Sequence, residues 1–398
     1  MTRRRPVSWP LGRPASVRAS GWLLAAVVLC AMALRPQLVG VGPLIPSIQD
    51  DLTLSYPVAG LLGSLPIACM GLFAFAAPPV VSRLGTSRAM VAAMVILGAG
   101  GVARSLVVGA PDLIALTLVV GLGMGLAGAL LPTAVRAWFP GTERLATGLY
   151  GGGIQVGAAL SAAIGVPIAQ AAGSWRWSLL AFSVVPFVAL ALWVAGRGAR
   201  SSSPPVAASA GAARPRGTGL LLIVVFAAAG TVYYGINAWL PSAYLEFGWG
   251  PGPTGALLGV LNVTQIPAAL SAGYLATRIG LGRLIGAYAA LVLVAVCGLV
   301  LAPGLGFLFV VLYGLGNGSI FTLMLAVPLE LGRVASEVTR ATAMMLGWGY
   351  LITAASPVVL GIVRDQLGEF SIALWLLVAV AALQLVVAVE VARRLRGS

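Results

Sequence analysis

The chain has 398 residues, of which 60% are hydrophobic and 9% are charged, and its mean hydropathy is +1.01. A soluble protein carries about 25% charged residues, so this composition excludes an ordinary soluble protein and indicates a polytopic membrane protein. The formal charge of +14 is the difference between 24 arginines and 10 acidic residues, since the chain has no lysine and no histidine. Nearly all of them lie at the ends of apolar runs, which indicates membrane topology and argues against nucleic-acid binding.

Apolar runs of about 20 residues predict twelve membrane-spanning helices and hence an all-α fold. The N-terminal end has the charge and length of a secretory signal peptide. We expect a first membrane helix there instead, because an internal repeat extends into the same segment. The predicted spans are residues 20–48, 57–82, 88–109, 112–136, 145–171, 175–196, 218–245, 253–277, 284–302, 305–331, 340–363 and 370–392.

The two halves of the chain match each other at an offset of 195 residues. The stretch "IPSIQDDLTLSYPVAGLLGS" aligns without a gap on "LPSAYLEFGWGPGPTGALLG", so that Pro46 matches Pro241 and Asp51 matches Glu246. A repeat of six spans gives both copies the same membrane orientation. This is the parallel-repeat arrangement of a secondary transporter that is built from two six-helix halves.

Arginine counts predict the orientation of these spans. The side that holds both termini and the linker between the halves carries 20 arginines, and the other side carries three. The positive-inside rule therefore places both termini in the cytoplasm. We expect the protein to lie in the cytoplasmic (inner) membrane. The expected segments are a cytoplasmic tail (1–19), a six-helix half (20–197), a Ser/Pro/Ala/Arg-rich cytoplasmic linker (198–217), and a second half with a short cytoplasmic tail (218–398).

Several stretches resemble a known family of transporters. The turns "SRLGTSR" and "TRIGLGR" follow the second and eighth spans and resemble the cytoplasmic-loop signature of the major facilitator superfamily. More specifically, "LRPQLVGVGPLIPSIQDDL" and "YYGINAWLPSAYLEFG" resemble the cyanate permease and 2-nitroimidazole transporter branch. The resemblance extends over about residues 20–395 and implies solute transport, with substrates that differ within the branch.

The first span carries a single charge, Arg35, which lies about 14 residues, or about 21 Å, from either end of the span. An arginine at this depth costs about 2.5–3.5 kcal/mol on insertion scales, so it needs polar surroundings. No acidic residue lies at the same depth. One interpretation is that Arg35 faces a water-filled cavity and binds an anion or a polar solute. The other is a structural role in which Arg35 bonds backbone carbonyls, one of which Pro36 frees.

The repeat predicts what stands opposite Arg35. Position 35 matches Gly230, so we expect a gap rather than a counter-charge in the second half. Tyr234 and Asn237 follow on the same helical face, at i+4 and i+7. Together these residues predict a pocket with one cationic wall and one aromatic, hydrogen-bonding wall. Tyr233 is adjacent and could replace Tyr234 if the helix is rotated, and a packing role for either tyrosine is the alternative.

Other polar residues within the spans are supporting candidates. We expect Gln155 and Asn317 to line the cavity, although amides in a bilayer most often bond neighbouring helices. Asn262, Gln265, Trp348 and Tyr350 are weaker candidates. Arg104, Arg136 and Arg176 lie near span ends, where we expect them to anchor the helices. No pattern of metal ligands or of cofactor binding is present, and the three cysteines lie inside apolar runs.

The two matched turns after the second and eighth spans are candidates for a gate. We expect them to close the cytoplasmic side through contacts between arginines and the carbonyls at helix C-termini, whose partial negative charge favours cations. The gating candidates are Arg83, Gly85 and Arg88 in the first half and Arg278, Gly280 and Arg283 in the second.

These patterns predict a monomeric membrane transporter of a small anionic or polar organic solute that works by alternating access. The resemblance implies that the solute is of the cyanate-like or nitro-aromatic-like class. We do not expect an enzyme, because no Ser/His, paired-Asp or metal-ligand cluster is present. Its partners would be the small-molecule substrate and the lipid bilayer. One alternative is an efflux pump for hydrophobic drugs, in which Arg35 is structural. The other is a membrane sensor that uses the same fold without transport, against which the short loops argue.

Overall fold

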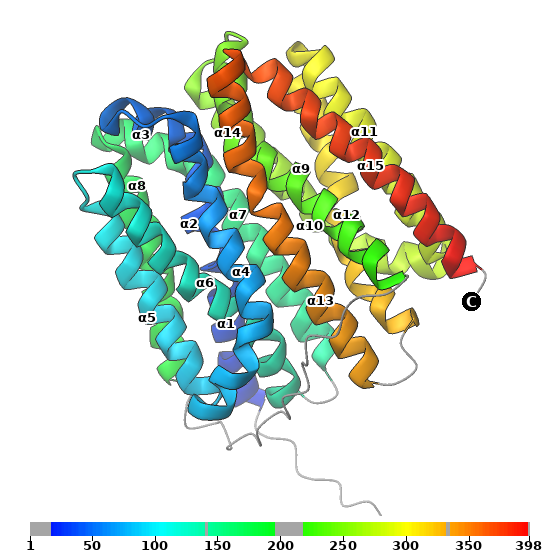
Figure 1. Cartoon of the computed structure of the whole chain (residues 1–398). Coiled ribbons are helices and arrows are strands. Elements are labelled where there is room, and N and C mark those ends of the chain that lie inside the picture. Colours follow the sequence, from blue (N-terminus) through cyan, green and yellow to red (C-terminus); the bar gives the residue numbers. More distant parts are fainter. Residues whose placement is uncertain (1–16, 140–141, 196–217, 332–334, 397–398) are drawn as a thin grey trace, which may run out of the picture.

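The computed structural model describes residues 17–139, 142–195, 218–331 and 335–396 (Figure 1). Within these ranges, twelve helical spans are long and apolar enough to cross a membrane, which confirms the predicted number. The predicted linker 198–217 lies outside the described residues, as does the predicted tail 1–19 except for its last three positions.

The helices of the first half alternate in direction and form one bundle (Figure 1). They are α1 (Val17–Met32), α2 (Pro36–Val39), the 3-10 helix η1 (Gly42–Leu44), α3 (Ile45–Leu52), α4 (Tyr56–Leu84), α5 (Thr86–Ser105), α6 (Ala110–Trp138), α7 (Glu143–Ala172) and α8 (Trp175–Ala195). We call the face at which α1 begins and α4 ends the terminal face. The face at which α3 ends and α4 begins is the opposite face.

The second half forms a matching bundle beside the first (Figure 1). Its helices are α9 (Thr218–Glu246), α10 (Pro251–Ile279), α11 (Leu281–Leu301), the 3-10 helix η3 (Pro303–Leu305), α12 (Gly306–Leu331), α13 (Ala335–Thr353), α14 (Ala355–Leu367) and α15 (Phe370–Arg396). The fold is therefore all-α, with two six-helix repeats, as predicted.

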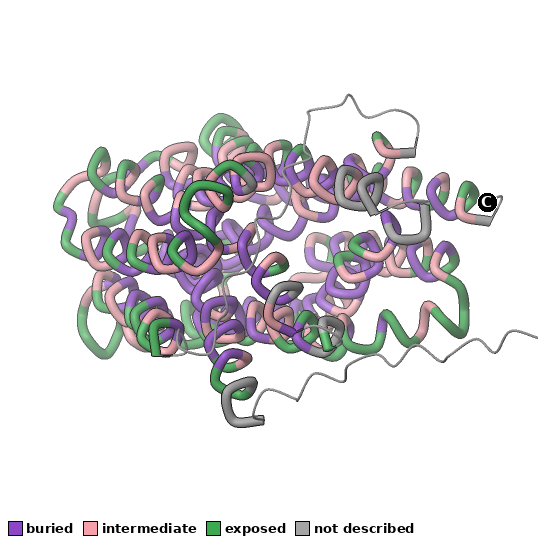
Figure 2. The backbone as a smooth tube through the Cα atoms, turned by 90° about the horizontal axis from the view of Figure 1, so that it is seen from below, coloured by how far each residue is buried: buried purple, intermediate pink, exposed green. Residues whose placement is uncertain are grey.

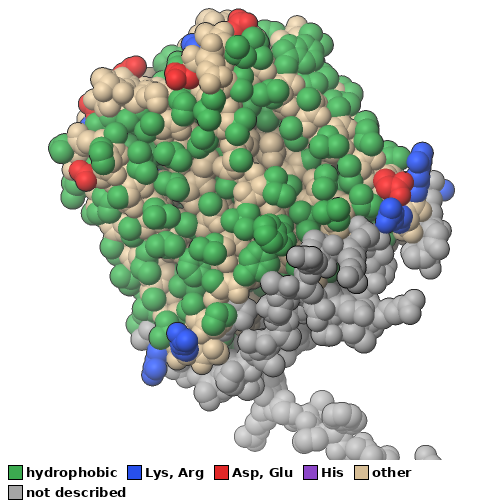
Figure 3. Space-filling model, in the orientation of Figure 1, with side chains coloured by type: hydrophobic (Ala, Val, Ile, Leu, Met, Phe, Trp, Pro, Cys, Tyr) green, Lys and Arg blue, Asp and Glu red, His purple; other side chains and the backbone are tan. Residues whose placement is uncertain are grey.

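The surface has the distribution of side chains that a lipid environment requires. Figure 3 shows a broad hydrophobic band, and the charged side chains in that view lie near helix ends. Large apolar side chains such as Leu270 and Val386 are exposed to 66% and 67%. The buried residues lie toward the middle of the two bundles (Figure 2). Lipid tails can cover an apolar surface of this kind, whereas exposing it to water has a large cost in free energy.

The first span is interrupted, whereas the sequence predicted one continuous helix. α1 ends at Met32, α2 begins at Pro36, and η1 and α3 complete the span. Pro36, Pro43 and Pro46 lack a backbone N–H, so none of them can donate to the carbonyl four residues earlier. The eleventh span is also divided, between α13 and α14 at Ala354.

Neighbouring helices approach this interrupted span closely. A Cβ placed on Gly157 of α7 would lie 2.2 Å from the carbonyl oxygen of Met32, which Pro36 leaves without its usual donor. Gly153, one turn earlier in α7, approaches the carbonyl of Val28 in the same way, at 2.8 Å. The glycines of α7 thus allow tight packing between helices.

The two halves are in close contact near the opposite face. A Cβ on Gly42 would lie 2.0 Å from the carbonyl oxygen of Asn237, and one on Gly60 would lie 2.6 Å from that of Pro357. Helices α7 and α10 also meet near this face, where Gly259 packs against Ala163. Toward the terminal face, the Cβ positions of Gly148 in α7 and Gly273 in α10 have no heavy atom within 4 Å. The close packing observed between these two helices therefore lies toward the opposite face.

Charged and aromatic side chains cover the contact at the opposite face. The repeat-related acids each form an ion pair of 2.6 Å, Asp51 with Arg176 and Glu246 with Arg364. Arg176 also donates to the carbonyl of Val107, at 2.9 Å. It thus caps the end of its own bundle, which agrees with the predicted anchoring role.

Arg364 belongs to the second half but reaches the first. Its Cζ atom lies 4.7 Å from the ring centroid of Tyr56 at the start of α4. The Tyr56 ring also packs against Trp239 and Phe370 of the second half, with centroid distances of 5.7 and 5.5 Å. One tyrosine of the first half is thus surrounded by side chains of the second.

We predict that Gly157→Ala lowers the stability of the protein, because its methyl group would overlap the Met32 carbonyl. Overpacking of this kind costs about 1–3 kcal/mol. Gly148→Ala in the same helix is the matched control, since its methyl group meets nothing and alanine favours a helix by about 1 kcal/mol. Thermal melts of the purified variants in detergent should show a lower midpoint for the first and an equal or higher one for the second. Equal midpoints for both variants would contradict the close approach of α1 and α7.

Candidate functional site

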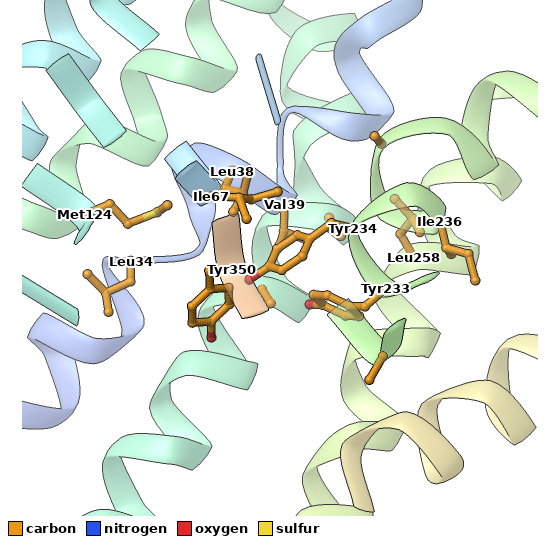
Figure 4. Close-up of a cluster of buried hydrophobic side chains, with 14 of the residues drawn as sticks. Leu34, Leu38, Val39, Ile67, Met124, Tyr233, Tyr234, Ile236, Leu258 and Tyr350 are labelled. Carbon is orange, nitrogen blue, oxygen red and sulfur yellow. The ribbon is translucent and has the colours of Figure 1, made fainter. Parts of the chain in front are cut away.

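Arg35 lies in the bend between α1 and α2, where it is the residue preceding the first turn of α2. It is 7% exposed, and its Nη1 atom donates a hydrogen bond to the hydroxyl of Tyr234 on α9. Its Cζ atom lies 5.6 Å from the ring centroid of Tyr234 and 6.0 Å from that of Tyr233. The contact joins the first half of the protein to the second at the centre of the molecule. Figure 4 shows Tyr234 beside Val39 in this region.

No carboxylate neutralises Arg35 within the described part of the chain. The ion pairs there join Arg176 with Asp51, Arg364 with Glu246, and two arginines of α15 with Glu390, and all of them lie at helix ends. The partners of Arg35 are a phenol and two aromatic faces, which are neutral. A buried cation with neutral partners attracts an anion, because the protein itself does not compensate its charge.

A chain of hydrogen bonds extends from Tyr233 into the second half. The Tyr233 hydroxyl donates to Oδ1 of Asn262 at 2.7 Å, and Nε2 of Gln265 donates to the same oxygen at 3.3 Å. Nδ2 of Asn317 donates to Oε1 of Gln265 at 3.3 Å, while Oδ1 of Asn317 is buried without a partner. Asn317 is thus connected to the tyrosines through two amides, and it has acceptor capacity left.

Asn237 joins the same network. Its Oδ1 accepts a hydrogen bond of 3.3 Å from Nδ2 of Asn262, and its own Nδ2 donates to the Tyr233 carbonyl at 2.8 Å. The structure therefore brings together Arg35, Tyr233, Tyr234 and Asn237 directly, and Asn317 through Asn262 and Gln265. The latter two residues were the weaker candidates in the sequence, yet they hold this network together.

Tyr350 contributes a third ring to the site. It is 8% exposed, and its ring packs edge to face against Tyr234 with centroids 6.5 Å apart (Figure 4). Trp348, which was weighed beside it in the sequence, is 48% exposed and packs against Phe75 at 6.1 Å instead. The two residues are two positions apart in α13, so their side chains point to different sides. Only the structure shows which of the two faces the centre.

Gln155 and Gly230 do not match their predicted surroundings. Gln155 is half-buried in α7, and no described side-chain hydrogen bond connects it to Arg35 or to the amide network. Gly230 does not leave a gap opposite Arg35, because a Cβ there would lie 2.4 Å from Oγ1 of Thr353. The prediction of a gap was wrong, since this glycine serves the packing of α9 against α13 within the second half.

A small cavity lies next to the Arg35–Tyr234 contact, between the bend of the first span, α4 and α9. It is no larger than a water molecule requires. Its walls are mostly apolar, and Tyr234 and Asn237 supply polar groups to them. The lining residues are Leu38, Val39, Val41, Gly42, Ile45, Gly63, Ile67, Tyr234, Asn237 and Ala238.

The matched turns lie at the terminal face, at the ends of α4 and α10. Gly85 and Gly280 have φ angles of 74° and 96°, a region that favours glycine, so the sharp turn from one helix to the next explains both glycines. Their four arginines are exposed, and Arg278 lies over the Tyr274 ring at 5.5 Å. No described hydrogen bond or ion pair connects Arg83, Arg88, Arg278 or Arg283 to another residue. Their contact with helix C-termini stays a prediction.

Comparison with known proteins identifies the family. The profile of the Major Facilitator Superfamily matches residues 21–357. The 2-nitroimidazole transporter of Escherichia coli (strain K12) is 30% identical over 377 residues, which cover 92% of this chain and 93% of the relative. The cyanate transport protein of the same organism is 27% identical over 355 residues, which cover 87% and 91%.

Solved structures support the same fold. A bacterial homolog of the human lysosomal transporter Spinster, in an inward-facing and occupied conformation, superposes with a TM-score of 0.75 over 96% of this chain and 98% of that chain, at 15% identity. The protein is thus a multi-pass membrane protein with the fold and the relatives of a secondary transporter of small solutes. The chain belongs to the Major Facilitator Superfamily.

Proposed function

We propose that the protein transports a small anionic or polar organic solute, which Arg35 binds at the centre of the membrane. The observation that carries the proposal is that Arg35 is 7% exposed and has only neutral partners in the described part of the chain. A structural arginine would be expected to pair with a carboxylate or to cap carbonyls. Arg35 instead donates to a phenol of the other half, which a solute could replace.

The geometry supports a site that both halves share. Arg35 supplies donors from the first half, and Tyr234 and Asn237 supply a hydroxyl and an amide from the second. The Tyr234 oxygen accepts from Arg35, and no described acceptor takes its proton, so the hydroxyl can donate to an anion beside the guanidinium. An anion held by both halves would favour the state in which the halves are close around it. Rocking of the halves about this site is alternating access.

The resemblance to the cyanate and 2-nitroimidazole transporters supports a cyanate-like or nitro-aromatic-like solute class. Both kinds of solute are small and planar or linear, and they carry negative or electron-rich atoms that a guanidinium fork can bind. The described acidic residues lie at helix ends, so we propose no carboxylate proton relay. Uniport, exchange and entry with a protonatable solute are the coupling modes that fit this arrangement.

A second candidate function is the efflux of hydrophobic drugs. It is favoured by the aromatic rings around Arg35, where Tyr233, Tyr234 and Tyr350 form edge-to-face pairs and Phe226 packs against Tyr350 at 5.2 Å. In that case the rings would bind the drug and Arg35 would be structural. The substitutions below separate the two functions.

We propose that the protein lies in the cytoplasmic membrane as a monomer. The positive-inside rule places both termini in the cytoplasm. The terminal face would then be cytoplasmic. The close packing of α7 and α10 toward the opposite face, with space beside Gly148 and Gly273 at the other end, would fit a site that opens to the cytoplasm and is closed at the opposite face.

Arg35→Ala should weaken solute binding and leave a folded protein, because the substitution removes a buried charge rather than a packed apolar group. We expect a loss of about 2 kcal/mol or more in binding free energy, the scale of a charge-assisted hydrogen bond. Arg35→Lys should be intermediate, since it keeps the charge without the planar fork. Tyr234→Phe and Asn237→Ala should each cost about 0.5–1.5 kcal/mol.

The measurement begins with the uptake of small anions, including cyanate, into proteoliposomes with and without a pH gradient. Binding of the transported anion to purified variants in detergent follows, alongside a thermal melt. Arg394→Ala is the matched control, because this arginine is exposed on α15 and pairs with Glu390 far from the site. Normal binding by Arg35→Ala, or loss of the folded protein, would make the arginine structural and favour drug efflux.

The orientation can be tested with single cysteines in a chain whose own cysteines are replaced. Cysteines placed in residues 198–217 should be inaccessible to an impermeant maleimide in intact cells and reactive after the membrane is opened. A cysteine at Gly252, which is exposed at the start of α10, is the positive control at the opposite face. Labelling of the 198–217 cysteines from outside would overturn the orientation.

We propose that the matched turns act as a gate at the terminal face. Arg83→Ala and Arg278→Ala should slow transport several-fold and change solute binding only slightly. Both side chains are exposed at the terminal ends of α4 and α10, whereas Arg35 lies near the centre of the molecule. The rate at saturating solute and the binding constant are the two quantities to compare. If binding collapses while the saturated rate is unaffected, these turns do not form a gate.

A further inference from the structure

A second arginine is buried in the first half, and its position does not match the anchoring role that the sequence predicts. Arg104 lies in the last turn of α5 and is 1% exposed. Its Nη2 atom donates to Oε1 of Gln37 at 2.6 Å and to the carbonyl of Gln37 at 2.9 Å. Nη1 lies 3.4 Å from Oγ1 of Thr117. Arg104 therefore reaches the interrupted first span, two residues beyond Arg35.

The interruption of the first span explains why the backbone carbonyl of Gln37 needs a hydrogen-bond donor from another helix. In a continuous helix its carbonyl would accept from the N–H of Val41, but that N–H donates to the carbonyl of Leu38 instead. Arg104 takes the freed carbonyl. Sequence counting placed Arg104 close to the end of its span, but it could not show that the first span bends toward it.

The Gln37 side chain has no freedom to turn away. Its Nε2 atom donates to Oγ of Ser183 at 2.8 Å and lies 3.3 Å from the carbonyl oxygen of Leu179. Gly101, one turn before Arg104, leaves the necessary space, because a Cβ there would lie 2.6 Å from that Nε2 atom. The guanidinium of Arg104 is thus fixed against the bend.

Every partner of Arg104 is neutral, and its Nε atom has no partner. An arginine stays protonated in a protein, so the charge persists. Arg35 has neutral partners too. The first half therefore holds two buried positive charges next to one short segment, and none of the described acidic residues pairs with either. At the offset of the repeat, the second half has Gly230 and Leu299 in their places.

We propose that Arg104 is a specificity-determining residue that makes the central site select anions, because it adds a second positive charge without contacting the solute. The inference rests on the proposed function of Arg35. A hydrogen bond to the Gln37 carbonyl alone would need only a neutral donor. A buried charge acts over a longer distance, since little water screens it.

The test measures the electrostatic potential at the site and needs no knowledge of the solute. In a chain with Cys30, Cys69 and Cys297 replaced by alanine, Tyr234→Cys introduces one thiol where Arg35 donates. Its modification rates with an anionic sulfonatoethyl and a cationic trimethylammonium methanethiosulfonate give a ratio that reports the local charge. Thermal melts check that each variant is folded.

Two substitutions should lower the anion-to-cation rate ratio, one by removing the positive charge and the other by adding a negative charge beside it. Arg104→Gln removes the charge and keeps a donor for the Gln37 carbonyl. Gln37→Glu keeps Arg104 and places a carboxylate against it, in a side chain of the same shape. We expect each to reduce the ratio at least about tenfold. Arg104→Lys should keep the ratio, as should Arg176→Gln, whose arginine is already paired with Asp51.

An unchanged ratio in both substitutions would overturn the inference. So would a reduction by Arg104→Gln that Gln37→Glu does not reproduce, because the effect would then come from shape rather than charge. If Arg104→Gln does not fold, Gln37→Glu and Arg104→Lys decide. The proposed function fails separately if Arg35→Ala binds the transported anion normally. Loss of binding in Arg35→Ala with an unchanged ratio in the Arg104 variants would overturn this inference alone.

Discussion

Three prolines in the first span remove backbone N–H groups within eleven positions, and the central site depends on this interruption. A continuous helix would satisfy its own carbonyls and would carry Arg35 as one of many side chains on its surface. The interrupted span places Arg35 at the bend, where the backbone does not form a regular helix and the side chain is buried. It also creates the unsatisfied carbonyls that bring Gly157 and Arg104 close. The polar centre and the tight packing of the first half thus have one physical cause.

The repeat is preserved at the edges of the molecule and lost at its centre. At the opposite face, matched acids form ion pairs in both halves, and at the terminal face, matched glycines form the same turn. At the centre, the first half has cations where the second has Gly230 and Leu299, and the second half has tyrosines and amides. Two bundles with the same fold therefore present different chemistry to one site, which a polar or charged solute requires if it is to bind in one orientation.

Much of this could be predicted from the sequence, because membrane spans leave a strong record in composition. The twelve spans, the two repeats and the grouping of Arg35 with Tyr233, Tyr234 and Asn237 follow from length, charge and offset. Arg104 could not be recognised, since a position near a span end says nothing about a bend in another helix. Gly230 was misjudged because a glycine can leave an open space or can allow a neighbouring residue to approach closely. Only the packing around it in the structure distinguishes these two cases. Tyr350 and Trp348 illustrate the same limit for the rotation of a helix.

The two ion pairs at the opposite face each lie within one half. Asp51 and Arg176 belong to the first, and Glu246 and Arg364 belong to the second, while the described contacts between the halves there are close backbone contacts, aromatic packing and the stacking of Arg364 on the Tyr56 ring. Separation of the halves at this face would thus leave both carboxylate–guanidinium pairs intact and expose mainly apolar and aromatic surface. If the halves rock as proposed, we expect the balance between closed and open forms to depend on hydration of that surface more than on screened charges, and hence to respond more to temperature than to ionic strength.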